Sequence, residues 1–489
     1  MMTAERRRGT GTAGIRRRAA AFAGAGPACA ALAGVALFPA QALAHASDRG
    51  HILLLPTGHY LAGGAAAVAL TFLVLALVPQ RALERPFGWR LAAGAVPEGL
   101  RLVSSALSFA FLVFLVAAGF LGSPDPLTNP LPLMVWAMFW VGMTLAQGAF
   151  GDIWRWLDPW YAPWRALAAL TRRDIPRANL PGRLGYWPAL VQFFAFAWFE
   201  LVYPAPDDPT ILARAVGVYF LVNLAAAFLF GHEAWSRQGE CLSAFLRMVA
   251  KLGIVEGRQE DGGGMRLFLC LPGAKLASAP PLPASGALFL LLALSSVSFD
   301  GLMRTFFWLG LIGVNPLEFP GRSAVTASST IGLAGAFALL AAAFFLAVAL
   351  GERLAGGKED AGADIRTAAG ALVWSIVPIA AAYHAAHYLP SLVVDAQYTL
   401  AALADPSGSS HLQVQAGALM GAERVWLLWN LQAGAIVAGH LLAILVAHLV
   451  AFRLHGTAAR TVRSQLPLAA LMVGYTVLGL WLLAAPTAG

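Results

Sequence analysis

Three histidines in apolar sequence have the clearest capacity for chemistry in this chain. His384 and His387 lie three residues apart in Tyr-His-Ala-Ala-His-Tyr, near the end of the apolar stretch 367–399. His440 lies deep inside another apolar stretch. Because ionisable groups are costly at membrane depth, such residues are candidates for a functional site. Residues i and i+3 share one face of a helix, so the paired imidazoles could turn toward the same metal ion.

Two carboxylates are expected at a similar depth. With a helical rise of about 1.5 Å per residue, Asp300 lies roughly 21 Å and Glu200 roughly 25 Å from the basic ends of their helices. The three histidines lie roughly 20–31 Å up theirs. We therefore predict a metal site with the ligands His384, His387, His440 and Asp300, and with Asp300 and Glu200 as catalytic carboxylates. This donor set favours zinc, with iron, manganese or copper as alternatives.

Each candidate also has a purely structural interpretation. The membrane histidines could each form a hydrogen bond to a neighbouring helix. Asp300 could pair with Arg304, four residues later, and Glu200 could lie at the membrane interface. His448 is roughly 12 Å along the helix from His440 and is therefore too far away to share its ion. We expect an interfacial position for His448.

The composition indicates a membrane protein. Of 489 residues, 59% are hydrophobic and 12% are charged, whereas soluble proteins have roughly 25% charged residues. Segments long enough to span a bilayer occur around 60–78, 103–122, 130–150, 185–203, 210–230, 286–300, 328–350, 367–390, 425–452 and 465–485. The predicted fold class is all-α: a polytopic helix bundle of about ten transmembrane helices, forming a single domain over residues 45–489. In the segment 286–314, a stretch with small polar residues, an acid and a glycine, 295–304, lies between two apolar runs and predicts a broken or re-entrant helix.

The positive charges alternate between loops. Lysines and arginines gather in the loops 79–102, 151–183, 232–285, 351–366 and 453–464, whereas 122–130 and 203–209 contain none. By the positive-inside rule the basic loops face the cytoplasm, which places both termini of the mature chain on the outer, periplasmic side of a bacterial inner membrane. The aromatic residues of 154–164 predict an interfacial belt on the inner side. Cys241 and Cys270 fall in an inner loop, so no disulfide framework is expected.

The first 44 residues resemble a secretory signal peptide. They contain six arginines, an apolar run and a small-residue site before His45. They also contribute most of the net charge of +8, so the charge does not indicate a nucleic-acid partner. An uncleaved first helix is the alternative. His45, His51, His59 and His411 form a second set that could bind copper or zinc, or could be ordinary exposed histidines.

Common catalytic signatures are absent from the sequence. There is no phosphate-binding Gly-x-x-x-x-Gly-Lys-Ser/Thr motif and no Gly-x-Gly-x-x-Gly after a strand. There is also no Gly-x-Ser-x-Gly elbow and no His-Glu-x-x-His. These absences argue against work driven by ATP and against serine hydrolase chemistry.

Several short motifs carry a family resemblance. They are the leader ending in Ala-His-Ala, Ser-Ser-Val-Ser-Phe-Asp-Gly-Leu, Gly-Val-Asn-Pro-Leu-Glu-Phe-Pro-Gly-Arg, Tyr-His-Ala-Ala-His-Tyr-Leu and Gln-Ala-Gly-Ala-Ile-Val-Ala-Gly-His. Together they resemble bacterial integral membrane proteins commonly labelled fenitrothion hydrolase. The resemblance implies hydrolysis of an aryl dialkyl phosphorothioate at a membrane-bound site. By motif position it extends to Asp300, His384, His387, His440 and His448. The stretch after His45 departs from the family's Tyr-Asp-Leu-Pro pattern.

Two principal functions follow from these residues. The first is a membrane-embedded, metal-dependent hydrolase, in which the ion activates water and polarises the phosphoryl group of an apolar small-molecule substrate entering from the membrane lipid. The second is a secondary transporter or metal permease, with Asp300 as a proton carrier. Haem ligation by paired histidines is a third alternative, and the sequence leaves open a second membrane subunit.

Overall fold

The computed structural model describes residues 57–171, 176, 178–260, 264–356, 364–406, 414 and 421–487. The predicted signal peptide, together with His45, His51 and His411, lies outside this part of the chain. The structure is 77% helical and 4% strand, which confirms the predicted all-α class. Nine helical segments of the described chain are long and apolar enough to cross a membrane, and the tenth predicted span is the shorter apolar helix α10, Trp187–Leu201.

The spanning segments follow the predicted apolar stretches. They are α3 (Thr57–Leu77), α5 (Gly99–Leu121), α6 (Pro130–Leu133) continued by the π-helix η1 (Met134–Met143) and α7 (Thr144–Phe150), α11 (Pro209–Phe230), α15 (Ala284–Met303), α17 (Thr326–Ala355), α18 (Ile365–Leu372) continued by η5 (Val373–Ser375) and α19 (Ile376–Ala404), α20 (Ala422–His455) and α21 (Ala458–Ala484). The shorter elements are α4 (Gln80–Phe87), α8 (Trp154–Leu157), α9 (Tyr161–Thr171), η2 (Gly182–Leu184), α12 (His232–Gln238), α13 (Cys241–Val249), α14 (Ala274–Ala277), α16 (Phe306–Leu311), η3 (Pro316–Glu318) and η4 (Arg322–Val325).

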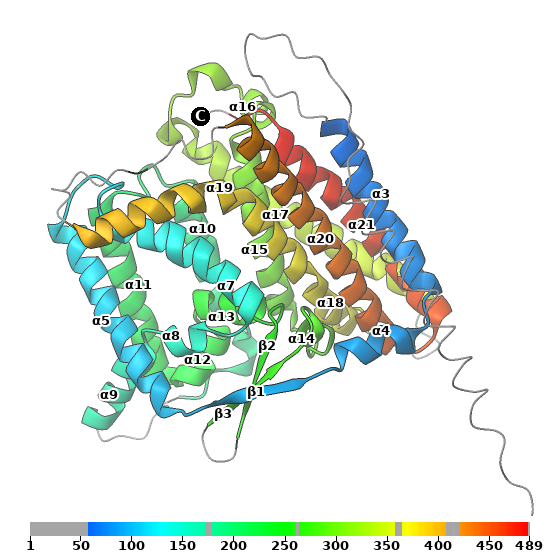
Figure 1. The fold of residues 1–489 in the computed structure, drawn as a ribbon, viewed down its shortest axis with the longest axis horizontal. Coiled ribbons are helices and arrows are strands. Elements are labelled where there is room, and N and C mark those ends of the chain that lie inside the picture. Colours follow the sequence, from blue (N-terminus) through cyan, green and yellow to red (C-terminus); the bar gives the residue numbers. More distant parts are fainter. Residues whose placement is uncertain are drawn as a thin grey trace, which may run out of the picture. The chain divides into compact units, whose positions relative to one another are not determined.

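The basic loops meet at one end of the helix bundle, hereafter the basic end (Figure 1, lower side). A small antiparallel sheet of β1 (Leu91–Val96), β3 (Met265–Leu269) and β2 (Val255–Gln259), in that order, joins the loop 79–102 to the loop 232–285. Arg101 adds a link to a third basic loop through a hydrogen bond to the carbonyl oxygen of Arg155, 3.2 Å away. The charge alternation therefore predicted which loops lie together.

The predicted helix break within 286–314 is present, but it follows the polar stretch of α15 rather than falling inside it. The helix runs unbroken to Met303, and the chain turns at Thr305 before α16. The serine hydroxyls donate to carbonyl oxygens of their own helix, as in Ser295 to Leu292 at 3.0 Å and Ser298 to Leu294 at 2.9 Å. Because these groups are satisfied locally, apolar surroundings do not force the helix to unwind.

The tryptophans of 154–164 do not all lie at a lipid interface, which corrects the predicted aromatic belt. Trp154 and Trp160 are buried. The indole of Trp154 donates to the Ser243 hydroxyl at 2.9 Å, and that of Trp160 donates to the carbonyl oxygen of Phe220 at 3.0 Å. Their rings pack the short helices of the basic end against the bundle.

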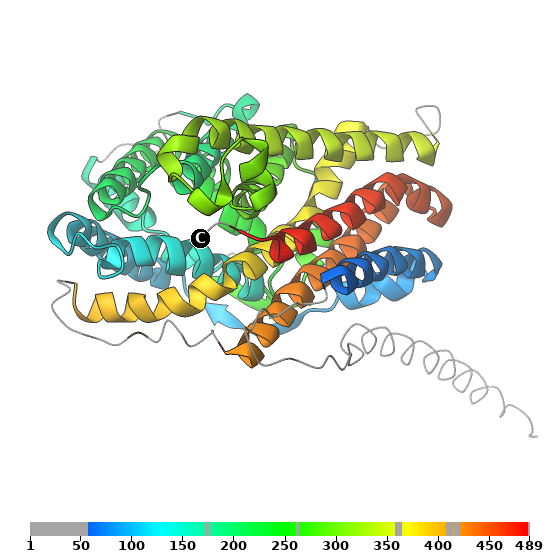
Figure 2. The ribbon, with the colours of Figure 1, turned by 90° about the horizontal axis from the view of Figure 1, so that it is seen from above.

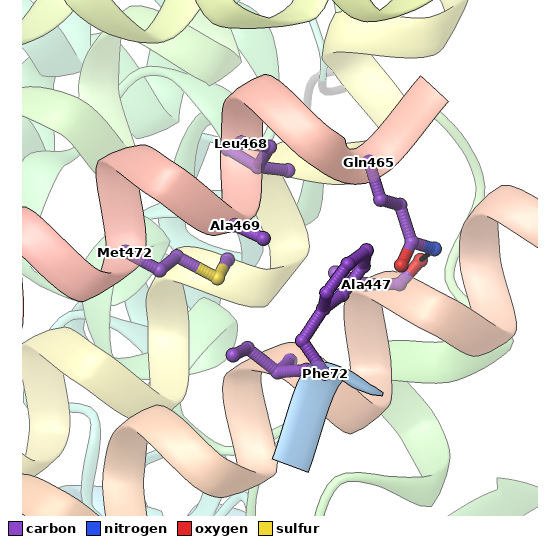
Figure 3. Close-up of a pocket in the computed structure, with 7 residues that line it drawn as sticks. Phe72, Ala447, Gln465, Leu468, Ala469 and Met472 are labelled. Atoms are coloured by element: carbon purple, nitrogen blue, oxygen red, sulfur yellow. Dashed lines mark hydrogen bonds between the residues drawn. The ribbon is translucent and has the colours of Figure 1, made fainter. Parts of the chain in front are cut away.

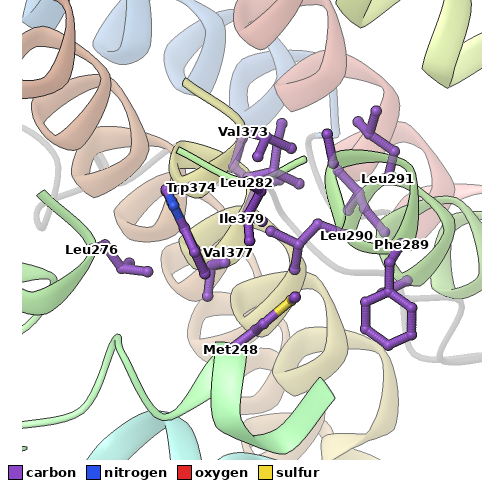
Figure 4. Packing of buried hydrophobic residues seen from close by; sticks show 14 of the residues in the cluster. Met248, Leu276, Leu282, Phe289, Leu290, Leu291, Val373, Trp374, Val377 and Ile379 are labelled. Atoms are coloured by element: carbon purple, nitrogen blue, oxygen red, sulfur yellow. The ribbon is translucent and has the colours of Figure 1, made fainter. Parts of the chain in front are cut away.

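The largest buried cluster joins the spanning helices to the loop 232–285. Met248 of α13 and Leu276 of α14 lie beside Leu290 of α15 and Val377 of α19 (Figure 4). The basic-end loop is therefore built into the bundle rather than appended to it. Close helix crossings complete the packing: a Cβ placed on Gly351 of α17 would lie 1.9 Å from the carbonyl oxygen of Ser464 on α21, a contact that only glycine permits.

Helix α19 bends within the sequence that carries the paired histidines. Pro390 lies inside this helix, where it removes one backbone hydrogen bond and crowds the preceding turn. The second half of α19, gold in Figure 1, runs in a different direction from the first half. Figure 2 shows the same change of direction from above. His387 and Tyr388 lie in the turn that precedes Pro390.

Candidate functional site

The centre of the candidate site is a buried carboxylate between α15 and α19. Asp300 lies one turn before the end of α15 and is 3% exposed. Its Oδ2 atom is 2.8 Å from His387 Nε2 and 2.8 Å from the hydroxyl oxygen of Tyr388. Both groups come from consecutive residues of α19, so one carboxylate oxygen receives two donors from the same turn of that helix.

A second carboxylate joins through the same tyrosine. Glu200, at the end of α10, lies with its Oε1 atom 3.2 Å from the Tyr388 hydroxyl oxygen. That hydroxyl has only one proton to donate. When it donates to the nearer Asp300, the contact to Glu200 is a hydrogen bond only if a protonated Glu200 donates to the tyrosine oxygen. The geometry therefore favours one proton, besides that of the Tyr388 hydroxyl, shared by the two carboxylates.

Two arginines flank the cluster. Arg304, one turn after Asp300 on the chain, has its Nε atom 3.9 Å from Asp300 Oδ1, but its side chain is 56% exposed. The predicted pairing of Asp300 with Arg304 is therefore present only as a long, weak ion pair. Arg322 donates to the backbone carbonyl oxygen of Glu200 at 2.8 Å and so fixes the end of α10. Asp300 Oδ1 itself has no hydrogen-bond partner among the described residues.

His387 is considerably more exposed than Asp300. Its side chain is 29% exposed, against 4% for Asp300. Because the Nε2 proton is directed at Asp300, the neutral ring presents Nδ1 as its basic nitrogen. His387 can therefore accept a proton from outside the cluster while its other nitrogen is held by the carboxylate.

His384 faces a different helix from His387. Its Nε2 atom donates to the carbonyl oxygen of Trp140 at 3.1 Å, on the π-helix η1. The imidazole lies edge-on to the rings of Trp140 and Tyr388, with centroids 5.0 and 4.8 Å away. Its Nδ1 atom is buried without a hydrogen-bond partner in the described chain. Single π-turns are common at functional sites, but here the contact orients an imidazole away from Asp300.

His440 also stays outside the cluster. Its Nδ1 atom is 2.8 Å from the carbonyl oxygen of Ile436, four residues earlier in the same helix, rather than bonded to a neighbouring helix. Within the described residues no group of three or more His, Cys, Asp or Glu side chains could hold a metal ion. A structural zinc site needs four ligands and a catalytic one needs three. The predicted set of His384, His387, His440 and Asp300 therefore does not fit such a metal.

Sequence reasoning missed the residue that connects the site. Tyr388 directly follows His387 in Tyr-His-Ala-Ala-His-Tyr, but a tyrosine on the surface of a helix is usually interpreted as a packing residue. Its position next to an ionisable pair was the available signal. The other predicted residues lie elsewhere: His59 is exposed on α3, and His448, expected at an interface, is buried.

Comparison of the chain with protein-family models, with curated proteins and with solved structures returned no match. The fold and the site nevertheless define a class. The chain is an all-α, polytopic membrane protein. Its described residues include a hydrogen-bonded cluster of two carboxylates, one imidazole and one phenol around the buried Asp300.

Proposed function

We propose that this protein is a secondary transporter in which the Asp300 cluster carries protons. The observation that supports the proposal is the unbroken hydrogen-bonded series from Glu200 through Tyr388 and Asp300 to His387. Chains of acidic residues and histidines inside membrane bundles are the usual proton relays of pumps and transporters.

The series can move a proton without losing its geometry. A proton on Glu200 passes to the Tyr388 oxygen as the tyrosine gives its own proton to Asp300. In the His387 tautomer that holds its proton on Nδ1, the Nε2 atom then accepts the proton from Asp300, and Nδ1 releases its own proton to the outside. Each transfer breaks one O–H or N–H bond and forms another, so the cluster gains or loses one proton in total.

The arrangement also suits alternating access. Glu200 lies on α10, Asp300 on α15 and His387 on α19, so the cluster ties three separate helices together. Adding a proton removes the negative charge that attracts His387 and Arg304. A change of proton number would therefore change the attraction between helices, which is how a transporter couples protonation to movement.

The test uses the full-length protein in sealed liposomes containing a pH-sensitive dye. A potassium diffusion potential drives protons inward, with and without an aryl dialkyl phosphorothioate such as fenitrothion outside. We expect proton uptake in the wild type, loss of uptake in Asp300→Asn, and wild-type uptake in the matched control His59→Ala. Wild-type liposomes that behave like empty ones would refute the proposal.

A second candidate is hydrolysis of an apolar phosphotriester, favoured by the Asp300–His387 pair. A carboxylate that holds one imidazole nitrogen leaves the other able to act as a general base. His387 Nδ1 would take a proton from water, the hydroxide would form a bond to phosphorus, and the aryl oxide would leave. Release of the phenol from fenitrothion by protein in detergent micelles, where no sealed compartment exists, would favour this function over transport.

A further inference from the structure

We propose that buried histidines of α20 form the path by which protons travel between the basic end and the Asp300 cluster. This inference rests on the proposed transport function. His440 is 1% exposed and His448 is 4% exposed, and the side chain of His455 is 2% exposed. The membrane-spanning bundle thus holds three buried imidazoles on one helix.

The three histidines lie along one side of the helix. They are separated by eight and then seven residues, which corresponds to about 12 and 10 Å along the axis. At about 100° per residue all three fall within an arc of about 80°. Histidines placed at random in an apolar helix would not be expected to lie on one side of it. The stripe begins at the basic end, where α20 finishes at His455.

The lowest histidine has a carboxylate beside it. His455 Nε2 lies 3.2 Å from Glu352 Oε1, near the end of α17, and the glutamate side chain is 8% exposed. This contact places an imidazole and a carboxylate, two groups that can exchange protons, side by side. This pair lies at the basic end, where protons would enter the proposed path.

The middle histidine is oriented by α21. His448 Nδ1 donates to the side-chain oxygen of Gln465 at 3.3 Å, and the Gln465 amide nitrogen donates to the carbonyl oxygen of Ala447 at 3.1 Å. The hydrogen bond fixes Nδ1 as the protonated nitrogen, so Nε2 is the one that can accept. The glutamine therefore gives the imidazole a defined orientation in an otherwise apolar region.

A small cavity lies next to this pair. Gln465, Ala447 and Met472 line it together with Phe72 of α3 (Figure 3). Its space of about 10 Å³ is close to that needed for one water molecule. Because the histidines are more than one hydrogen bond apart, water must bridge them during transfer. This cavity has room for one water beside Gln465, the polar residue of its lining.

The upper part of the path leads to the cluster through hydroxyl groups. His440 Nε2 and the hydroxyl of Tyr383 are both buried without hydrogen-bond partners among the described residues. Tyr383 lies on α19, four residues before His387, on the same side of that helix. The hydroxyl of Tyr475 is hydrogen-bonded to Ser298, two residues before Asp300. Both helices that form the site, α15 and α19, therefore carry hydroxyl groups on the proposed path.

The alternative is that His448 only fastens α20 to α21. The variant His448→Asn separates these roles, because its amide can still donate to Gln465 but cannot carry a proton at physiological pH. The liposome assay is run on the wild type, His448→Asn, Glu352→Gln and the exposed control His59→Ala. Thermal unfolding in detergent reports whether each variant folds.

If the path operates as proposed, proton uptake falls about 100-fold in His448→Asn, as expected for removing a positioned proton-transfer group, while unfolding stays near that of the wild type. Glu352→Gln also loses uptake. Wild-type uptake in folded His448→Asn and Glu352→Gln, with loss in Asp300→Asn, would overturn the path and leave the transport function standing. No uptake in the wild type would overturn both.

Discussion

Replacing Asp300 by asparagine is the most direct test of the cluster. The substitution keeps the shape of the side chain and one oxygen that can accept from His387 and Tyr388. It removes the negative charge and with it the ability to take up a proton. We expect proton uptake to fall about 100-fold, the usual contribution of a positioned acid or base.

The accompanying loss of stability follows from the two contacts. Hydrogen bonds to a charged group contribute about 1.5–3 kcal/mol and neutral ones about 0.5–1.5 kcal/mol. Converting both 2.8 Å bonds of Asp300 from charged to neutral therefore costs about 2–3 kcal/mol before any relief from no longer burying a charge. The exposed Arg304 adds at most about 1 kcal/mol.

Asp300→Leu provides the comparison. It leaves the donors of His387 and Tyr388 unpaired in a buried site, at about 1–3 kcal/mol each, so it should unfold at a clearly lower temperature than Asp300→Asn. The two variants are compared by thermal unfolding in detergent and by dye-monitored uptake in liposomes. Full uptake in Asp300→Asn, or a leucine variant as stable as the wild type, would refute this account of the site.

Three further outcomes are expected. Tyr388→Phe should fold but show greatly reduced proton uptake, since the phenol links the two carboxylates; uptake equal to the wild type would contradict the relay. Gly351→Ala should lower the unfolding temperature by forcing α17 from α21, whereas Gly335→Ala on the same helix, with open space around it, should not. Burial raises the pKa of Glu233, but the Arg101 guanidinium outweighs it and brings that pKa down from 4.5 to about 2. The stability from this pair is therefore present above pH 4.5 and lost as the pH falls toward 2, so the acid-induced drop in unfolding temperature should be smaller in Glu233→Gln.

The spans and the clustering of basic loops were predictable because each depends on local sequence. A run of apolar residues excludes water whatever its neighbours are, and the arginines and lysines mark one end of each helix. The short length of α10 and the continuity of α15 through its polar stretch were harder to predict from the sequence. The polar residues predicted a break within 286–314 but not its exact position after Met303. The hydroxyls of Ser295 and its neighbours bond within the helix, a choice that depends on rotamers rather than on composition.

The candidate site was predictable only in part. Asp300 and His387 were singled out correctly as residues that would meet, and Glu200 lies beside them through Tyr388. The metal set did not assemble because depth along a helix says nothing about direction around it. The side chains of His384 and His387 leave α19 in directions that are about 60° apart around the helix axis. His384 therefore contacts η1, whereas His387 contacts α15.

The sequence by itself determined the class of protein: an all-α membrane bundle with ionisable groups at depth, since hydropathy and charge act residue by residue. Only the tertiary structure decided which of those groups touch. The contacts of Asp300 with His387 and Tyr388, and of His455 with Glu352, join helices far apart in the chain. Such contacts depend on how each helix is rotated against its neighbours, and that rotation is set by the packing of whole helix faces.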